Sequence, residues 1–174
     1  MAFNYQAIIT AFNSFANKNN MTSKAHQPNF RGIIDAINGL EEFGNRAKAE
    51  VHSSSPGINA NDLVYIDSSN RARLAQADSL TTAIVAGVAL ESGSAGETIT
   101  YGRNMVVEIT NISTSVDGSP TELTPGAKYY LSHTTAGNYT ATPEVSTAGA
   151  IVAPVGLAIS TTEITIEIEK VLKI

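Results

Sequence analysis

Three isolated histidines and one pair of adjacent glutamates are the first side chains to consider for acid–base chemistry. His26, His52 and His133 are far apart in the sequence and lie in loop-like surroundings. A histidine in that setting is more often a solvated side chain than a ligand or a general base. Glu41 and Glu42 are neighbours in a predicted helix, where consecutive residues point about 100° apart. They therefore cannot face one another as a catalytic pair.

Three glutamates near the C-terminal end form the other candidate for chemistry. Glu163, Glu167 and Glu169 lie close together on one predicted strand, and with added loop oxygens such a stripe could bind Ca²⁺ or Mg²⁺. A solvated strand face is the simpler interpretation. The sequence contains no cysteine and none of the nucleophile, zinc-protease or phosphate-loop motifs of common enzyme sites. It predicts no enzyme, no metal site and no cofactor.

Charge and aromatic content bear on the remaining ligand classes. The formal net charge of −5 opposes binding to nucleic acid phosphates, and Arg71 and Arg73 are too few to form a basic patch. No apolar run reaches the roughly 18 residues needed to cross a bilayer, so no membrane insertion is expected. The chain has no tryptophan, and Tyr65, Tyr129 and Tyr139 fall in or beside predicted strands. We expect these tyrosines to pack in a core or an interface, with a sugar-stacking role as the alternative.

The composition changes near residue 50 and divides the chain into two parts. Residues 1–50 contain all five phenylalanines and carry five basic against four acidic residues, whereas the rest carries six against twelve. We predict a helical attachment or oligomerisation segment over residues 1–50, a linker over residues 51–60, and a β-domain over residues 61–174.

The first part has apolar residues at helical spacing. They recur at three- and four-residue steps up to Phe15, and a second helix begins after Pro28, with apolar positions that continue to Ala47. The two helices could pack as a hairpin, or the second could associate with copies of itself or with a partner. The predicted oligomer or anchor interface comprises Phe3, Phe12, Phe15, Phe30, Ile33, Ile37 and Leu40.

The second part has short β-branched and aromatic runs separated by turns rich in glycine, serine, proline and aspartate. This rhythm is typical of an antiparallel β-sandwich or barrel. The stretch "EITIEIEKV" alternates strictly, which places Ile164, Ile166 and Ile168 on one face of the last strand. The predicted fold is therefore mainly β, preceded by a short helical segment.

One apolar phrase occurs twice. Residues 83–92 read "AIVAGVALES" and residues 150–160 read "AIVAPVGLAIS". In both halves the phrase follows a tyrosine-containing strand, a polar turn and a short second strand, which predicts an internal duplication of a four-strand unit. Pro154 has no backbone N–H, so the second copy of the phrase must lie at a sheet edge or break at a bulge.

The order of the phrases in the second part resembles a known group of domains. "NDLVY" at residues 61–65, "AGVAL" at 86–90, "AGET" at 95–98 and "LTPGAKYYLS" at 123–132 follow one another. This order is similar to that in the small β-domains of tailed-bacteriophage virion proteins. Such domains occur in capsid decoration (cement) proteins and in the knobs or collars of trimeric head, neck and tail fibres. The resemblance covers roughly residues 57–168.

The resemblance implies a function for the whole chain. We expect a non-enzymatic structural component of a tailed-phage virion, made in the host cytoplasm, that forms a homo-oligomer, with a trimer favoured. The N-terminal segment would attach it to capsid, neck or tail proteins. The alternative is a receptor-binding knob that recognises host-surface glycans.

Overall fold

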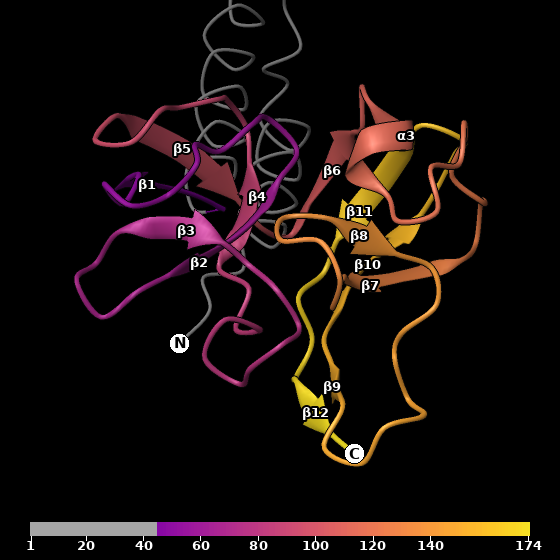
Figure 1. Cartoon of the computed structure of the whole chain (residues 1–174). Coiled ribbons are helices and arrows are strands. Elements are labelled where there is room, and N and C mark those ends of the chain that lie inside the picture. The colour runs from indigo at the N-terminus through magenta and orange to yellow at the C-terminus, as the bar shows by residue number, and fades with distance from the viewer. Residues whose placement is uncertain (1–44) are drawn as a thin grey trace, which may run out of the picture. The chain divides into compact units, whose positions relative to one another are not determined.

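The computed structural model describes residues 45–174, and this part of the chain consists mainly of antiparallel β-sheet (Figure 1). The first five-stranded sheet has the order β1-β5-β4-β2-β3. Its strands are β1 (Arg46–Glu50), β2 (Leu63–Ile66), β3 (Ala72–Leu74), β4 (Gly87–Ala89) and β5 (Thr98–Gly102). The predicted mainly-β, antiparallel class is confirmed.

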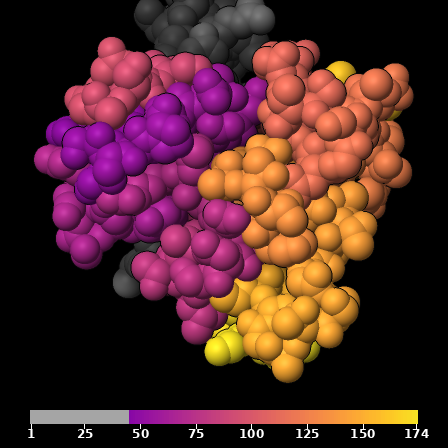
Figure 2. Space-filling view, in the orientation of Figure 1, coloured from indigo at the N-terminus to yellow at the C-terminus, as the bar shows by residue number. Residues whose placement is uncertain are grey.

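A second five-stranded sheet follows in the chain, with the order β6-β11-β10-β7-β8. Its strands are β6 (Met105–Glu108), β7 (Lys128–Leu131), β8 (Tyr139–Thr140), β10 (Pro154–Ala158) and β11 (Glu163–Ile166). Two short strands, β9 (Ile151–Val152) and β12 (Leu172–Lys173), pair separately, and one helical turn, α3 (Ile112–Ser115), follows β6. Figure 2 shows the residues of the two sheets side by side, indigo to magenta for the first and salmon to yellow for the second.

The two sheets have the same strand order when β9 is set aside. Counted in chain order, the first strand of each sheet (β1 or β6) pairs with the last (β5 or β11). The fourth strand (β4 or β10) lies between the last and the second (β2 or β7). The hydrogen bonds before the second strand also match: Asn61 N donates to Ala89 O, and Gly126 N donates to Ala158 O, both at 2.8 Å. Asn61 and Gly126 share a left-handed backbone, with φ of 75° and 79°. These matches define the corresponding positions in the two sheets.

Each sheet is also bridged between its outer strands in the same way. Val51, directly after β1, forms a parallel bridge with Ala72 of β3. Val116, at the end of α3, forms the corresponding bridge with Tyr139 of β8. The bridge at Val51 therefore brings the chain from the edge strand β1 to the opposite edge strand, β3.

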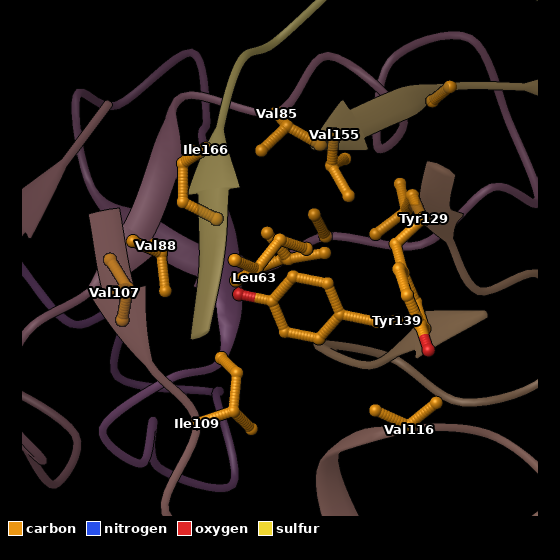
Figure 3. Packing of buried hydrophobic residues seen from close by; sticks show 14 of the residues in the cluster. Leu63, Val85, Val88, Val107, Ile109, Val116, Tyr129, Tyr139, Val155 and Ile166 are labelled. Carbon is orange, nitrogen blue, oxygen red and sulfur yellow. The ribbon is translucent and has the colours of Figure 1, made fainter. Parts of the chain in front are cut away.

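The buried side chains form two clusters. The smaller one belongs to the first sheet and its bridging segment: Val51, Ile58, Val64, Ala72, Ala89 and Ile99. The larger one contains residues from both sheets. Figure 3 shows Leu63 and Val88 of the first sheet gathered with Val107, Ile166 and the ring of Tyr139. The two sheets therefore share a core, in which burial of apolar side chains is the main stabilising term.

The boundary between the two parts of the chain lies earlier than the sequence predicts. Residues 46–50 were predicted to end the helical segment, but they form strand β1, which pairs with β5 from Arg46↔Gly102 to Glu50↔Thr98. The stretch "RAKAE" favours a helix by composition, and pairing with β5 overrides that preference. Within the predicted linker, Val51 and Ile58 are buried in the core. The predicted helices before residue 45 lie outside the described residues.

The two copies of the repeated phrase adopt different secondary structures. Its identical letters "AIVA" lie in turn and loop at residues 83–86, and strand β4 begins only at Gly87. In the second copy, Ile151 and Val152 form the separate strand β9. The parts that correspond are Gly87–Ala89 and 156–158, because Ala89 and Ala158 make the matching hydrogen bonds.

Pro154 breaks the sheet register, as its missing N–H predicts. It opens β10, an inner strand of the second sheet, and the register with β7 shifts between Pro154 and Gly156. The bulge alternative is therefore confirmed. The predicted last strand is only partly confirmed: Ile164 and Ile166 are fully buried, but β11 ends at Ile166.

A candidate interaction surface on the second sheet

The outer face of the second sheet carries apolar side chains that are not covered by other described residues. Strand pairing sets Val106, Thr165, Leu157 and Lys128 side by side on β6, β11, β10 and β7. Val106 is 49% exposed and Leu157 40%. Ile159, two residues beyond Leu157, is 49% exposed and continues the ladder by donating its N–H to Glu163 O at 2.9 Å. We call Val106, Leu157 and Ile159 the outer apolar strip.

Charged side chains surround the outer apolar strip. Glu108 and Glu163 are paired on β6 and β11. Glu167 is exposed just beyond β11. The Lys128 ammonium lies 2.6 Å from the Glu169 carboxylate, which raises the pKa of Lys128. The face therefore combines an apolar centre with a mostly acidic rim, an anatomy common in protein–protein interfaces.

The corresponding face of the first sheet is buried on strands β2 and β4. Counting from the matched pairs Asn61/Gly126 and Ala89/Ala158, Leu63 corresponds to Lys128, Val88 to Leu157 and Leu90 to Ile159. Leu63 and Val88 are fully buried in the shared core. Leu90 is partly buried against it. The second half of the chain thus covers the β2 and β4 part of this face in the first sheet, whereas Arg46 of β1, which corresponds to Val106, is exposed.

Hairpin β7–β8 forms backbone hydrogen bonds with the first half of the chain. Gly137, at the tip of the hairpin, accepts a hydrogen bond from Leu63 N at 2.8 Å and donates one to Ala75 O at 2.7 Å. Gly137 has φ of 85°, and a Cβ there would lie 2.9 Å from a methyl of Leu74. A glycine therefore allows the hairpin tip to approach β2 and β3 closely.

Asn61 fixes the first sheet to the strand that opens the second. Its side-chain nitrogen Nδ2 donates to Glu108 O at 3.0 Å, and its side-chain oxygen Oδ1 accepts from Thr110 N at 3.2 Å. Asn61 is itself buried, so these bonds satisfy side-chain atoms that burial would otherwise leave unpaired.

A polar cluster holds the turn of hairpin β2–β3. The Asp67 carboxylate accepts from Arg73 Nε at 3.0 Å and lies 3.8 Å from His52 Nε2. Desolvation alone would raise the pKa of Asp67, but hydrogen bonds from Arg71 N, the Arg73 side chain and Ser69 N lower it. The cluster joins the segment after β1 to the hairpin.

His52 and Ser54 complete this cluster without forming a catalytic triad. Ser54 N and Ser54 Oγ both lie within hydrogen-bond distance of His52 Nδ1, at 3.0 and 2.9 Å. Because the backbone N–H donates to Nδ1, the proton of neutral His52 resides on Nε2, which faces Asp67. The 3.8 Å separation there exceeds a hydrogen bond. The arrangement stabilises a turn.

Two surface hollows are polar. One, of about 350 Å³, is lined by Ala77, Asp78, His133, Glu144 and residues 147–151. In it, His133 Nε2 lies 3.9 Å from a Glu144 oxygen. The other, of about 410 Å³, lies at residues 108–113 beside Thr121 and Thr162. Within residues 45–174, no three histidine, aspartate or glutamate side chains gather as a metal site would require.

The other sequence candidates are placed as follows. The seven predicted interface residues, Phe3, Phe12, Phe15, Phe30, Ile33, Ile37 and Leu40, lie outside the described residues, as do His26, Glu41 and Glu42. Tyr129 and Tyr139 are buried, so their predicted core role is confirmed, and Tyr65 packs partly buried against the same core. Arg71 and Arg73 pair with Glu50 and Asp67.

The outer apolar strip was missed by sequence reasoning. In "MVVE" and "VGLAIS", apolar residues occupy consecutive positions, and a strand with no polar alternation must present apolar side chains on both faces. That signal predicts a strand covered on two sides, but the sequence does not say by what.

No family model matches the chain, and no curated protein matches it in sequence. Among the described residues, no helix is long and apolar enough to cross a membrane.

Proposed function

We propose that this chain is a non-enzymatic structural protein of a tailed-phage particle, which forms a homo-oligomer, with a trimer favoured, and is attached to the virion through its N-terminal segment. The order of its β-domain phrases resembles that of phage decoration and fibre domains. Other virion proteins of the capsid, neck or tail are its partners.

The observation that carries the proposal is the outer apolar strip. Three branched aliphatic side chains lie on one sheet face, and two of them are about half exposed. Surfaces of this kind serve contacts between proteins. A structural protein in an assembly can bind a neighbouring protein through such a face.

We further infer that the two sheets arose by duplication of one five-strand unit in a sandwich or barrel architecture. Their shared strand order, their matched bridges and the left-handed residues Asn61 and Gly126 support this inference. The first strand of each unit, β1 or β6, adds to the four strands that the sequence suggests.

Glycan recognition by the tyrosines has less support. The rings of Tyr129 and Tyr139 are buried, and a buried ring offers no face for a sugar to stack on.

The proposal is tested on particles. Particles of a tailed phage whose genome encodes this chain should be purified from a lysate by density gradient and analysed by peptide mass spectrometry. Peptides of this chain are expected in the particle fraction at a constant ratio to the major capsid protein, and antibodies against residues 45–174 should label the particle surface. Recovery of the chain only among unassembled proteins would contradict the proposal.

A further inference from the structure

We propose that the outer apolar strip binds hairpin β2–β3 of a second copy of this chain, in a contact that repeats the one made between the two sheets within each chain. This inference rests on the oligomeric part of the proposed function and adds to it the surface that joins the copies.

Two of the three residues of the receiving face, Leu157 and Ile159, have covered counterparts in the same molecule. Val88 is fully buried where the second half of the chain packs on the first sheet, and its counterpart Leu157 is 40% exposed. Leu90 and Ile159 show the same difference, partly buried against the core in one sheet and exposed in the other. The apolar character of the strip is explained if it too is covered in the assembled protein.

The hairpin that would cover it also has a counterpart. Within the chain, hairpin β7–β8 reaches Leu63 through Gly137 at its tip. The corresponding tip residue of hairpin β2–β3 is Asn70, which also has a left-handed backbone, with φ of 62°. Residues 68–70 are exposed. Within residues 45–174, the first half of the chain therefore offers an exposed hairpin tip, and the second half an exposed face.

The charges of the two surfaces are complementary. Hairpin β2–β3 carries Arg71 and Arg73, which pair with Glu50 and Asp67 within the chain, and the Arg71 side chain is still 38% exposed. The rim of the strip carries Glu108, Glu163 and Glu167. Opposite charges across an interface favour this docking orientation over one that brings the acidic rims of two copies together.

Such a contact joins different surfaces of the two partners, so it is heterologous. A heterologous contact generates a closed ring when its rotation closes, and an open filament when it does not. A ring of three copies would place six related sheets around one axis, which accords with the trimer favoured above.

The first test removes the strip without disturbing the fold. In the full-length protein, Leu157→Lys places a cation where an arginine-bearing hairpin must dock. Because residue 157 is paired with Lys128 on β7, the fold of this variant is checked separately. The matched control is Leu172→Lys, which changes another exposed leucine, 54% exposed, on strand β12. Sedimentation velocity at micromolar concentration is expected to show an oligomer for the wild type and for Leu172→Lys, and monomer for Leu157→Lys. Circular dichroism should be the same for all three.

The second test detects the contact itself. The chain has no cysteine, so introduced cysteines report only their own pairing. Asn70 and Lys128 correspond to Gly137 and Leu63, which share a backbone hydrogen bond of 2.8 Å; this brings the two residues into the range that a disulfide can bridge. The double variant Asn70→Cys/Lys128→Cys should form disulfide-linked multimers on oxidation, and Asn70→Cys/Lys173→Cys should not.

The outcomes separate this inference from the proposed function. If Leu157→Lys keeps the wild-type mass, or if the Asn70/Lys128 pair does not cross-link in an oligomer, the inference is overturned while particle association can still hold. If Leu157→Lys dissociates the oligomer but the chain is absent from particles, the inference stands and the virion role fails. A monomeric wild type would overturn the inference.

Discussion

Gly87 and Gly156 occupy corresponding positions in the two sheets, and each lies against the backbone of the next strand. A Cβ at Gly87 would lie 2.5 Å from Gly102 O, and one at Gly156 would lie 2.2 Å from Thr165 O. Both separations are too short for a carbon and an oxygen that are not bonded. The glycine shared by the two copies of the phrase is therefore a requirement of strand packing.

Substitution of either glycine by alanine is expected to destabilise the fold. Because the opposing atom is a backbone carbonyl and not a flexible side chain, the strands must separate, at a cost of about 1–3 kcal/mol. Urea unfolding of Gly87→Ala and Gly156→Ala measures the loss. The reverse exchange Ala86→Gly, next to β4, measures how much backbone freedom alone changes the stability. Wild-type stability in both alanine variants would contradict the close strand contact.

Much of this architecture could be predicted from residue types, and the failures have physical causes. Alternation identified Ile164 and Ile166 as a buried face, because period-two patterning depends only on local geometry. The edge strand β1 could not be recognised from "RAKAE", whose alanine, lysine and glutamate favour a helix; its strand state depends on β5, about 50 residues away in the chain. The role of the Leu157 face depends on what covers it, which no local pattern encodes.

Two buried tyrosines should respond in opposite ways to the loss of their hydroxyl groups. Tyr129 OH accepts a hydrogen bond from Thr124 N at 3.1 Å. Tyr139 OH has no hydrogen-bond partner among the described residues, and burial, with the nearby Asp62 carboxylate, raises the pKa of Tyr139. Tyr129→Phe should lose about 1 kcal/mol of stability, whereas Tyr139→Phe should gain about 1 kcal/mol. Urea unfolding at neutral pH compares them, and equal losses would show that Tyr139 OH is satisfied.

Asp67 should make the stability of the domain sensitive to acid. Desolvation acts to raise the pKa of Asp67, but the hydrogen bonds from Arg71 N, the Arg73 side chain and Ser69 N lower it below the ordinary value of 3.8. The folded state therefore binds fewer protons than the unfolded state near that pH. The stabilisation is fully present above the unfolded-state pKa and is lost as the pH falls through the lower folded-state pKa.

The variant Asp67→Asn should accordingly be less stable than the wild type at neutral pH and should lose less stability on acidification from about pH 5 to about pH 3. Melting temperatures across that range measure the difference. Glu122→Gln, which alters an exposed carboxyl outside the cluster, should follow the wild-type profile. Parallel profiles for Asp67→Asn and the wild type would show that Asp67 makes no pH-dependent contribution to stability.

Two truncations that differ by five residues should separate attachment from folding. Residues 46–174 form one compact unit that includes β1, whereas residues 51–174 lack this strand and leave β5 without its partner along the edge from Thr98 to Gly102. We expect the chain 46–174 to be soluble and to unfold cooperatively, and the chain 51–174 to melt at a lower temperature. Equal melting temperatures would show that β1 adds nothing to the sheet.

The chain 46–174 also tests where the protein attaches. If the first 45 residues anchor it to the virion, as proposed, this chain should not bind particles that lack the protein, while the full-length chain should bind them in the same pull-down. Full occupancy by the shorter chain would move the anchor into the β-domain. Leu157→Lys in that background would then decide whether the outer apolar strip faces the particle, because its bulky cation should abolish binding there and leave it intact if another surface is used.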